Sequence, residues 1–419
     1  MKDKKQLLTA IKNTSVLCVV SLLLGAVIGA LDALFGRVLL AITDFRGIHP
    51  FWLIPFLGPA GVLIVVTYKK WGQGTEKGMG LIFSAGHGET DEIPLRLVPF
   101  VMISTWLTHL FGGSAGREGV AVQMGGTVSY WVGKKLPIKD AAKILLIVGM
   151  AAGFAGLFRT PLAAVCFALE VLVAGAIEYR ALLPAVFACY SASTVSGLCG
   201  LEKFTFAVSD FCNLDKFTVS VTNQELFTLP FAVRLIILGV VFGVTGGAFA
   251  GLLKWMKNVM AKAFSNPIIR ILVVGVGLSI IFMLLSKGRY SGLGTNLINA
   301  GLQNNEIYPW DWAIKFILTI LTLAAGFQGG EVTPLFSIGA GLGAVLGALL
   351  GLPVPLAAAL GYAAVFGGAS NTFFAPMLIG AEVFGFEYLP LFFIVCAIAY
   401  VCNMNFSIYG GQKQLSSYN

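Results

Sequence analysis

The sequence is poor in charged residues, and this scarcity excludes an ordinary water-soluble protein. Only 11% of the 419 residues are charged, whereas 57% are hydrophobic and the mean hydropathy is +0.86. Ordinary globular proteins carry about 25% charged residues, so most of the surface of this protein must face lipid. A spanning helix takes roughly 20 residues, which leaves little chain for a domain outside the membrane.

Histidines and paired cysteines are scarce as well. The chain has three histidines, and its seven cysteines lie mostly inside apolar segments without a CxxC pair. Metal sites and disulfide frameworks need such clusters, so we expect no metal and no cofactor. A membrane enzyme is also excluded, because no combination of nucleophile, base and metal is present. We therefore expect a protein that is not an enzyme.

The net charge of +8 does not indicate a nucleic-acid partner, because the basic residues are scattered among short loops. Lys2, Lys4, Lys5 and Lys12 precede the first apolar segment. Lysine and arginine near membrane ends mark the cytoplasmic side, so the N-terminus is predicted to be cytoplasmic. No cleavage site follows the first apolar run, so we expect no signal peptide.

Several apolar segments, such as 121–132 and 357–366, are shorter than the roughly 20 residues that a span requires. Glycine and proline interrupt them. Helices that end inside the membrane are tolerated where the freed backbone groups are buried in protein or line a polar cavity, as in transporters. We expect an all-α membrane protein of many tilted, partly re-entrant helices.

An internal duplication divides the chain. Nine residues between 149 and 171 recur 212 positions later, and a shift of 213 lays Glu118 over Glu331. Such self-similarity indicates repeated structural units. We predict a cytoplasmic segment (1–14), a first membrane repeat (15–200), a linker (201–225), a second membrane repeat (226–410) and a short tail (411–419).

Two glycine ladders indicate close helix packing, since glycine at every fourth position lets helix backbones approach in lipid. We expect this packing role, without a ligand, for Gly239, Gly243, Gly247 and Gly251 and for Gly339, Gly343, Gly347 and Gly351.

The glycine-rich turn Gly116-Arg117-Glu118-Gly119 leads directly into an apolar helix. Free N–H groups at a helix start form an anion site without a cationic side chain. A carboxylate there competes with an anion when ionised and leaves when protonated, so Glu118 is a candidate gate and proton carrier. Spacing alone supports equally a Glu118 that only neutralises Arg117 or the helix dipole.

The second half repeats this construction. Gly329-Gly330-Glu331-Val332-Thr333-Pro334 is predicted to open a helix from Leu335, with the proline in the first turn. Glu331 is either a second proton station or a buried, neutral side chain that holds a loop.

Two further sites give weaker signals. Gly78-Met79-Gly80 is a glycine-flanked break, and Tyr409 ends the last apolar segment. Taken alone, Met79 is more typical of core packing, and Tyr409 of an interfacial anchor in an aromatic belt.

Together these motifs resemble the CLC family of chloride channels and proton-coupled anion antiporters. The resemblance covers essentially the whole chain. It implies an inverted-repeat fold, a homodimer with one pathway per subunit, a gating Glu118 and an anion site near Met79 and Tyr409.

Departures from the chloride-type pattern are similar to the fluoride/proton branch of the bacterial CLC proteins. Met79 stands where chloride-type members have serine, and Val120 where they have proline. The second-half motif of chloride-type members lacks an acid, whereas this chain has Glu331 and Thr333 there. Val171 replaces the second glutamate of the chloride exchangers, so their inner proton route does not carry over.

The resemblance thus implies a fluoride exporter of the bacterial inner membrane that exchanges fluoride for protons and gives fluoride resistance. A chloride/proton antiporter and a passive anion channel of the same fold remain alternatives. The expected proton-transfer residues are Glu118 and Glu331, and the expected anion-binding residues are Gly78, Met79, Gly80, Thr333 and Tyr409. The anion site is expected to use the helix starts at Gly116, Arg117, Gly119, Gly330 and Val332.

Overall fold

A computed structural model describes residues 2–90, 92–208, 229–285, 288–303 and 306–415. Helices make up most of the described chain, and only two short strands accompany them. The predicted all-α fold class is confirmed. Most of the linker expected at 201–225 lies outside the described residues.

The helices of the first half, with the 3₁₀ turns marked η and one strand, are α1 (Lys2–Ile48), α2 (Pro50–Leu53), η1 (Ile54–Phe56), α3 (Leu57–Trp71), α4 (Met79–Gly86), α5 (Leu97–Leu110), α6 (Glu118–Gly133), α7 (Ala141–Phe158), α8 (Pro161–Glu170), β1 (Val173–Ala174), η2 (Tyr179–Ala181) and α9 (Leu182–Leu198). Those of the second half are α11 (Leu229–Ala263), α12 (Pro267–Leu284), α13 (Thr295–Leu302), α14 (Asp311–Ala325), α15 (Val332–Leu350), α16 (Val354–Ser370), α17 (Phe374–Phe384), η6 (Phe386–Tyr388), α18 (Leu389–Val401) and β2 (Lys413–Gln414).

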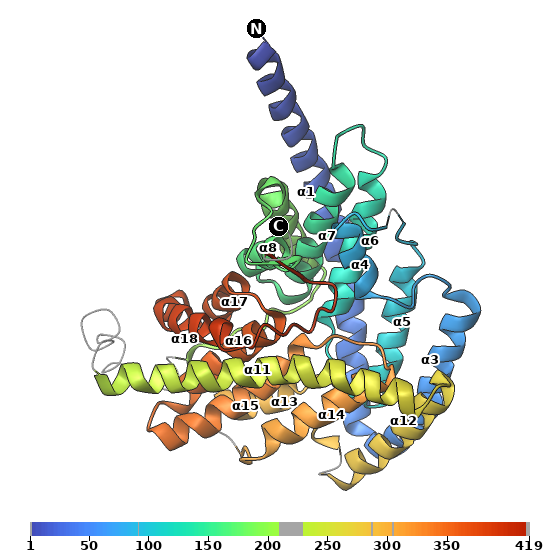
Figure 1. Ribbon diagram of the computed structural model, residues 1–419. Helices are drawn as coiled ribbons and strands as arrows, with labels where there is room; N and C mark the ends of the chain where they lie inside the picture. The colour runs from blue at the N-terminus through green and yellow to red at the C-terminus, as the bar shows by residue number, and fades with distance from the viewer. Residues whose placement is uncertain (1, 91, 209–228, 286–287, 304–305, 416–419) are drawn as a thin grey trace.

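Helix lengths fall into two groups. Seven helical segments of the described chain are long and apolar enough to cross a membrane, whereas α5, α8, α16 and α17 are apolar but shorter. The apolar segment 373–401 is not one helix, because Gly385 adopts a φ of +121° and separates α17 from η6 and α18. Figure 1 shows α11 lying across the other second-half helices and the start of α1 projecting from the body.

Each of two duplicated glutamates binds the start of a helix in the opposite half of the chain. Glu170, at the end of α8, accepts hydrogen bonds from the backbone N–H groups of Phe373, Phe374 and Ala375 at the start of α17. Glu382, on α17, accepts from Leu162 and Ala163 at the start of α8. Each carboxylate therefore caps the helix that carries the other one. This reciprocal arrangement agrees with the internal duplication.

Glycines bring helix pairs into backbone contact, as the ladders predict. On α11, an added Cβ at Gly243 or Gly247 would lie 2.4 Å from Ala399 O or 2.2 Å from Asn403 O. On α15, a Cβ at Gly339 would lie 2.1 Å from Gly361 O of α16. Gly351 is an exception to the predicted ladder, since it ends α15 with a φ of +65° and has no neighbour for a Cβ.

The chain after α18 returns across the first half. β2 pairs in parallel with β1, with Val173 opposite Lys413. The Ile408 N–H also donates to Ala369 O at 2.8 Å. These bonds hold the segment around Tyr409 against both repeats, which fixes its position at the site described below.

The α6–α7 contact gives a stability prediction. Gly149→Ala places a Cβ 2.1 Å from Gly125 O, so one helix must shift, and we expect a loss of about 1–3 kcal/mol in stability. Gly277→Ala is the matched control, because no atom lies within 4 Å of its added Cβ. Thermal unfolding in detergent measures both variants, and equal melting temperatures would contradict the packing account.

Candidate functional site

The starts of α6 and α15 meet at a two-residue backbone bridge. Gly116 N–H donates to Gly330 O at 2.5 Å, and Gly330 N–H donates to Gly116 O at 2.8 Å. A side chain fits at neither position, since a Cβ on Gly116 would lie 2.5 Å from Glu118 Oε2 and one on Gly330 2.9 Å from Gly119 N. Both glycines therefore serve the close approach of two helix N-termini.

Glu118 occupies the space between these helix starts. Its side chain is fully buried, and its Oε2 accepts from Arg117 N–H at 3.0 Å and Thr333 N–H at 3.1 Å. The Thr333 hydroxyl donates to Oε1. The carboxylate thus takes amide and hydroxyl donors from both halves, which is the environment that an anion would find there.

Of the two simpler roles expected for Glu118, neutralising the helix dipole fits its contacts with helix-start amides, whereas a direct ion pair with Arg117 is not formed. Within the described parts of the chain, no ion pair joins the two side chains, and Arg117 Nε and Nη1 have no hydrogen-bond partner. Glu118 is held by backbone amides and a hydroxyl instead.

Buried polar groups fix the loop before α6. Lys315, fully buried on α14, donates to Ser114 Oγ at 2.9 Å and to Gly292 O at 2.6 Å. His109, at the end of α5, contacts Ala115 O through Nε2 at 3.0 Å. A loop tied at two points holds the α6 N-terminus in place with little freedom to relax.

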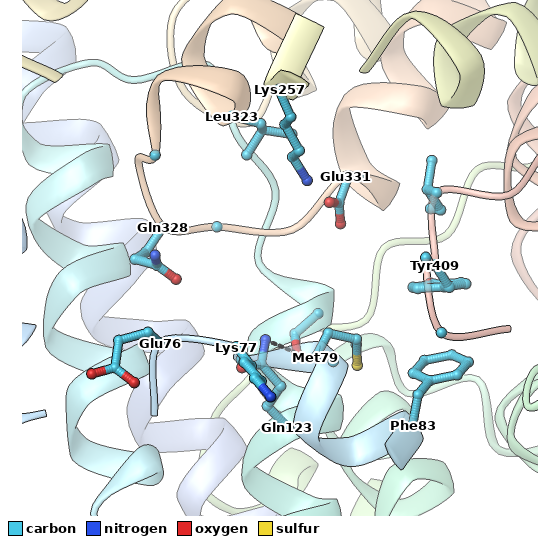
Figure 2. A pocket seen from close by; sticks show the side chains of 18 of the residues that line it. Glu76, Lys77, Met79, Phe83, Gln123, Lys257, Leu323, Gln328, Glu331 and Tyr409 are labelled. Atoms are coloured by element: carbon cyan, nitrogen blue, oxygen red, sulfur yellow. Dashed lines mark hydrogen bonds between the residues drawn. The ribbon is translucent and has the colours of Figure 1, made fainter. Parts of the chain in front are cut away.

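A cavity of about 790 Å³ reaches the site from one side (Figure 2). Glu331, Met79 and Tyr409 line it, and Gly119 forms part of its inner wall. Exposed Glu76 and Lys77 lie at its mouth. Glu118 does not line this cavity, because its side chain is enclosed by the bridge and Thr333. Water and ions in the cavity therefore reach Glu331 before Glu118.

Met79 and Tyr409 approach this cavity from opposite repeats. Met79 is the first residue of α4 and is half-buried, and its Cε lies 3.7 Å from the Cβ position of Gly119. Tyr409 is buried and stacks on Phe83 with ring centroids 5.4 Å apart. An aromatic-belt role for Tyr409 is therefore wrong, since its ring lies inside the protein.

Glu331 faces the cavity together with a cation. It precedes α15, is partly exposed, and lies opposite Lys257 of α11 in Figure 2. Across the described residues, no ion pair shorter than 4.0 Å ties Glu331 to a base. Glu331 is therefore only partly buried, and which of its two expected roles it has stays a prediction. The helix also begins earlier than predicted, at Val332, with Pro334 as its third residue.

The structure places the remaining expected residues around the same centre. Gly78 has a φ of +48° and, with Gly80, lines the cavity beside α4. Sequence reasoning missed Gln123, whose Nε2 donates to Gly119 O at 2.9 Å and whose Oε1 has no partner among the described residues. The sequence feature that could have indicated Gln123 is its position as a polar residue one turn inside an apolar helix.

A helical membrane protein in which two helix N-termini enclose a carboxylate at the end of a polar cavity has the architecture of an ion-transport protein. Residues 60–404 match the family described as voltage-gated chloride channel. The chain belongs to this family, and the resemblance inferred from its motifs is confirmed.

Individual relatives narrow the comparison. The chain is 34% identical to a chloride/fluoride channel protein of Pseudomonas syringae pv. tomato over 92% of its own length and 83% of the relative's. The crystal structure of a CLC-type fluoride/proton antiporter is 50% identical, with a TM-score of 0.90 over 96% of this chain and 98% of that one. A slow cyanobacterial Cl⁻/H⁺ antiporter shares the fold, with 19% identity, a TM-score of 0.77 and 95% coverage of each chain.

The Thr333 hydroxyl gives a prediction that does not depend on transport. Thr333→Val keeps the shape but removes a donor to a buried carboxylate, so we expect a loss of about 1–3 kcal/mol in stability. Thr333→Ser keeps the hydroxyl and is the control. Thermal unfolding of the purified protein compares them, and a valine variant as stable as the serine variant would show that the contact contributes little.

Proposed function

We propose that this protein is a proton-coupled fluoride antiporter that exports fluoride from the cytoplasm in exchange for protons. The observation that carries the proposal is the position of Glu118, whose carboxylate accepts hydrogen bonds from donors of both repeats. An ionised carboxylate and a fluoride ion compete for these donors. Protonation of Glu118 weakens its hydrogen bonds to the amides, so one proton is taken up when one anion binds at the site.

Fluoride is small and strongly hydrated, so its binding site must replace much of the lost water. The amides at the starts of α6 and α15 and the Thr333 hydroxyl supply short, charge-assisted hydrogen bonds. Met79 offers no hydroxyl on the opposite wall. Chloride is larger and gains less from such a compact set of donors, which favours fluoride at this site.

Glu331 provides a second proton station on the cavity side. It is partly exposed to a cavity that also contains Lys77, Lys257 and Arg270. These cations attract anions to the mouth, and Glu331 exchanges protons with the water there. A station at Glu331 takes the place of the acid that chloride exchangers carry at the position of Val171.

The cavity faces the cytoplasm in this proposal. Figure 1 places the connection between α6 and α7 at the end of the molecule where the chain begins. That connection and the next helix start carry Lys134, Lys135, Lys139 and Lys143, in addition to the N-terminal lysines. By the positive-inside rule, this end is cytoplasmic in the bacterial inner membrane. The family resemblance supports a homodimer and a role in fluoride resistance.

The relative of known structure supports fluoride over the alternatives. The 50% identical structure is that of a fluoride/proton antiporter, whereas the 34% identical relative is a chloride/fluoride channel protein, a name that covers both anions. Two variants distinguish the proposed function from a chloride/proton antiporter and from a passive channel.

The first variant is Glu118→Gln, which fills nearly the same volume but cannot bind and release a proton. In liposomes with a fluoride gradient, we expect proton movement to fall to the level of protein-free vesicles. Persisting wild-type proton transport would remove Glu118 from the coupling mechanism.

The second variant is Met79→Ser, which adds a hydroxyl donor to the cavity wall. We expect the fluoride-to-chloride flux ratio to fall by about tenfold, which corresponds to one hydrogen bond of roughly 1.4 kcal/mol. Met79→Leu is the matched control and is expected to keep the wild-type ratio. An unchanged ratio in the serine variant would leave Met79 as ordinary packing.

A further inference from the structure

The first span contains a carboxylate that the transport model above does not use. Asp32 lies within α1 and is 0% exposed. Neither of its carboxylate oxygens has a hydrogen-bond partner among the described residues. A bare buried carboxylate costs several kcal/mol, so a group of this kind inside a membrane protein calls for a functional explanation.

The absence of a side chain at Gly156 leaves room for the Asp32 carboxylate. On α7, a Cβ at Gly156 would lie 2.3 Å from Asp32 Oδ2, so a larger residue there would displace the carboxylate. Ala33, next to Asp32, packs in the same core cluster as Val120 and Ala121 in the first turn of α6, and the charge of Arg117 acts on Asp32. Within the described chain, the two side chains form no ion pair shorter than 4.0 Å, and Arg117 Nε and Nη1 are also buried without partners.

Two other titratable side chains near α1 have partners elsewhere, although Arg159 Nε is also buried without one in the described chain. α1 packs against α5, α6, α7 and α9. His109 of α5 contacts Thr105 O and Ala115 O, and Arg159 at the end of α7 donates to Leu201 O. Asp32 thus has two unused acceptors, and Arg117, whose charge acts on it, has two unused donors among the described residues. Water satisfies such a set, because a buried water needs two to four polar partners.

Arg117 connects this polar gap to Glu118. Its backbone N–H donates to Glu118 Oε2 at 3.0 Å, and the charge of its side chain acts on Asp32. The gap therefore lies beside Glu118, apart from the cavity that Glu331 lines.

The gap belongs to the end of the molecule opposite the cavity mouth. Asp32 follows the lysine-rich start of α1 by about 45 Å of helix, at 1.5 Å per residue. Gly156 lies in the last turn of α7, whose first turn carries Lys143. His87, close to the cavity residue Glu89, shares a surface hollow with that same Lys143.

We propose that Asp32 and Arg117 enclose water and form the outer proton-transfer station of the transporter, a role that rests on the proposed proton coupling. The O–H bond of protonated Glu118 breaks, a water carries the proton across, and an O–H bond forms on Asp32. The reverse transfer returns it. Arg117 keeps its proton throughout and stabilises the ionised form of Asp32.

The test begins with Asp32→Asn, which keeps the shape but removes proton exchange. In liposomes with a fluoride gradient, we expect coupled proton flux to fall by about tenfold or more, as for loss of a proton-transfer group. Fluoride binding to the detergent-solubilised protein should stay within about twofold of wild type, because donors at the Glu118 site are unchanged. Ser21→Ala is the matched control, since Ser21 is also on α1, 0% exposed and without a partner for its hydroxyl in the described chain.

A second measurement does not depend on transport or on the asparagine variant. In Asp32→Cys, a small cationic methanethiosulfonate reagent should modify the introduced thiol, with mass spectrometry locating the adduct. Native Cys189 is the internal control, because it is 0% exposed on the neighbouring α9. A thiol at position 32 as inert as Cys189 would show a dry site and overturn the proposal.

The outcomes separate the two levels of inference. If the wild type couples fluoride to protons and Asp32→Asn transports like Ser21→Ala, the outer station is wrong and the proposed function stands. If the wild type moves no protons with fluoride while the introduced thiol is labelled, the antiporter function and the proton role of Asp32 fall together, and only the hydrated gap remains.

Discussion

The backbone bridge between Gly116 and Gly330 is the constraint on which the site depends. It joins the N-termini of α6 and α15, and neither position has room for a Cβ. Free amides at two helix starts then converge on one point, where their partial positive charges add. The Glu118 carboxylate takes that point. Loop anchors such as Lys315, and glycines such as Gly149 and Gly361, keep the two helix starts at this separation.

The sequence motifs were sufficient to locate this centre, but not to predict its geometry. A glycine-rich turn followed by an apolar helix indicates an anion site from local physics alone, so Glu118 and Glu331 were accessible without a structure. The pairing of Gly116 with Gly330 could not be predicted, because the bridge joins positions more than 200 residues apart. The buried position of Tyr409 depends on the return of the last segment across the first repeat, which no local pattern encodes.

Other features escaped prediction for the same reason. Gly351 matches a packing ladder by spacing, yet it ends α15, because a helix terminus and a helix contact both favour glycine. Gln123 and Asp32 are single polar residues in apolar segments. Only their tertiary neighbours, the Gly119 carbonyl in one case and Gly156 with Arg117 in the other, distinguish them from tolerated polar substitutions.

In the proposed mechanism, the anion and the Glu118 carboxylate compete for one set of donors, so fluoride and protons must move in strict exchange. The most direct test is wild-type protein in liposomes that contain fluoride and an internal pH reporter, placed in fluoride-free buffer at equal pH. The account predicts that fluoride efflux drives protons inward and acidifies the lumen, with a much smaller response when chloride replaces fluoride. Fluoride efflux without acidification, under conditions where the membrane potential is clamped, would contradict it.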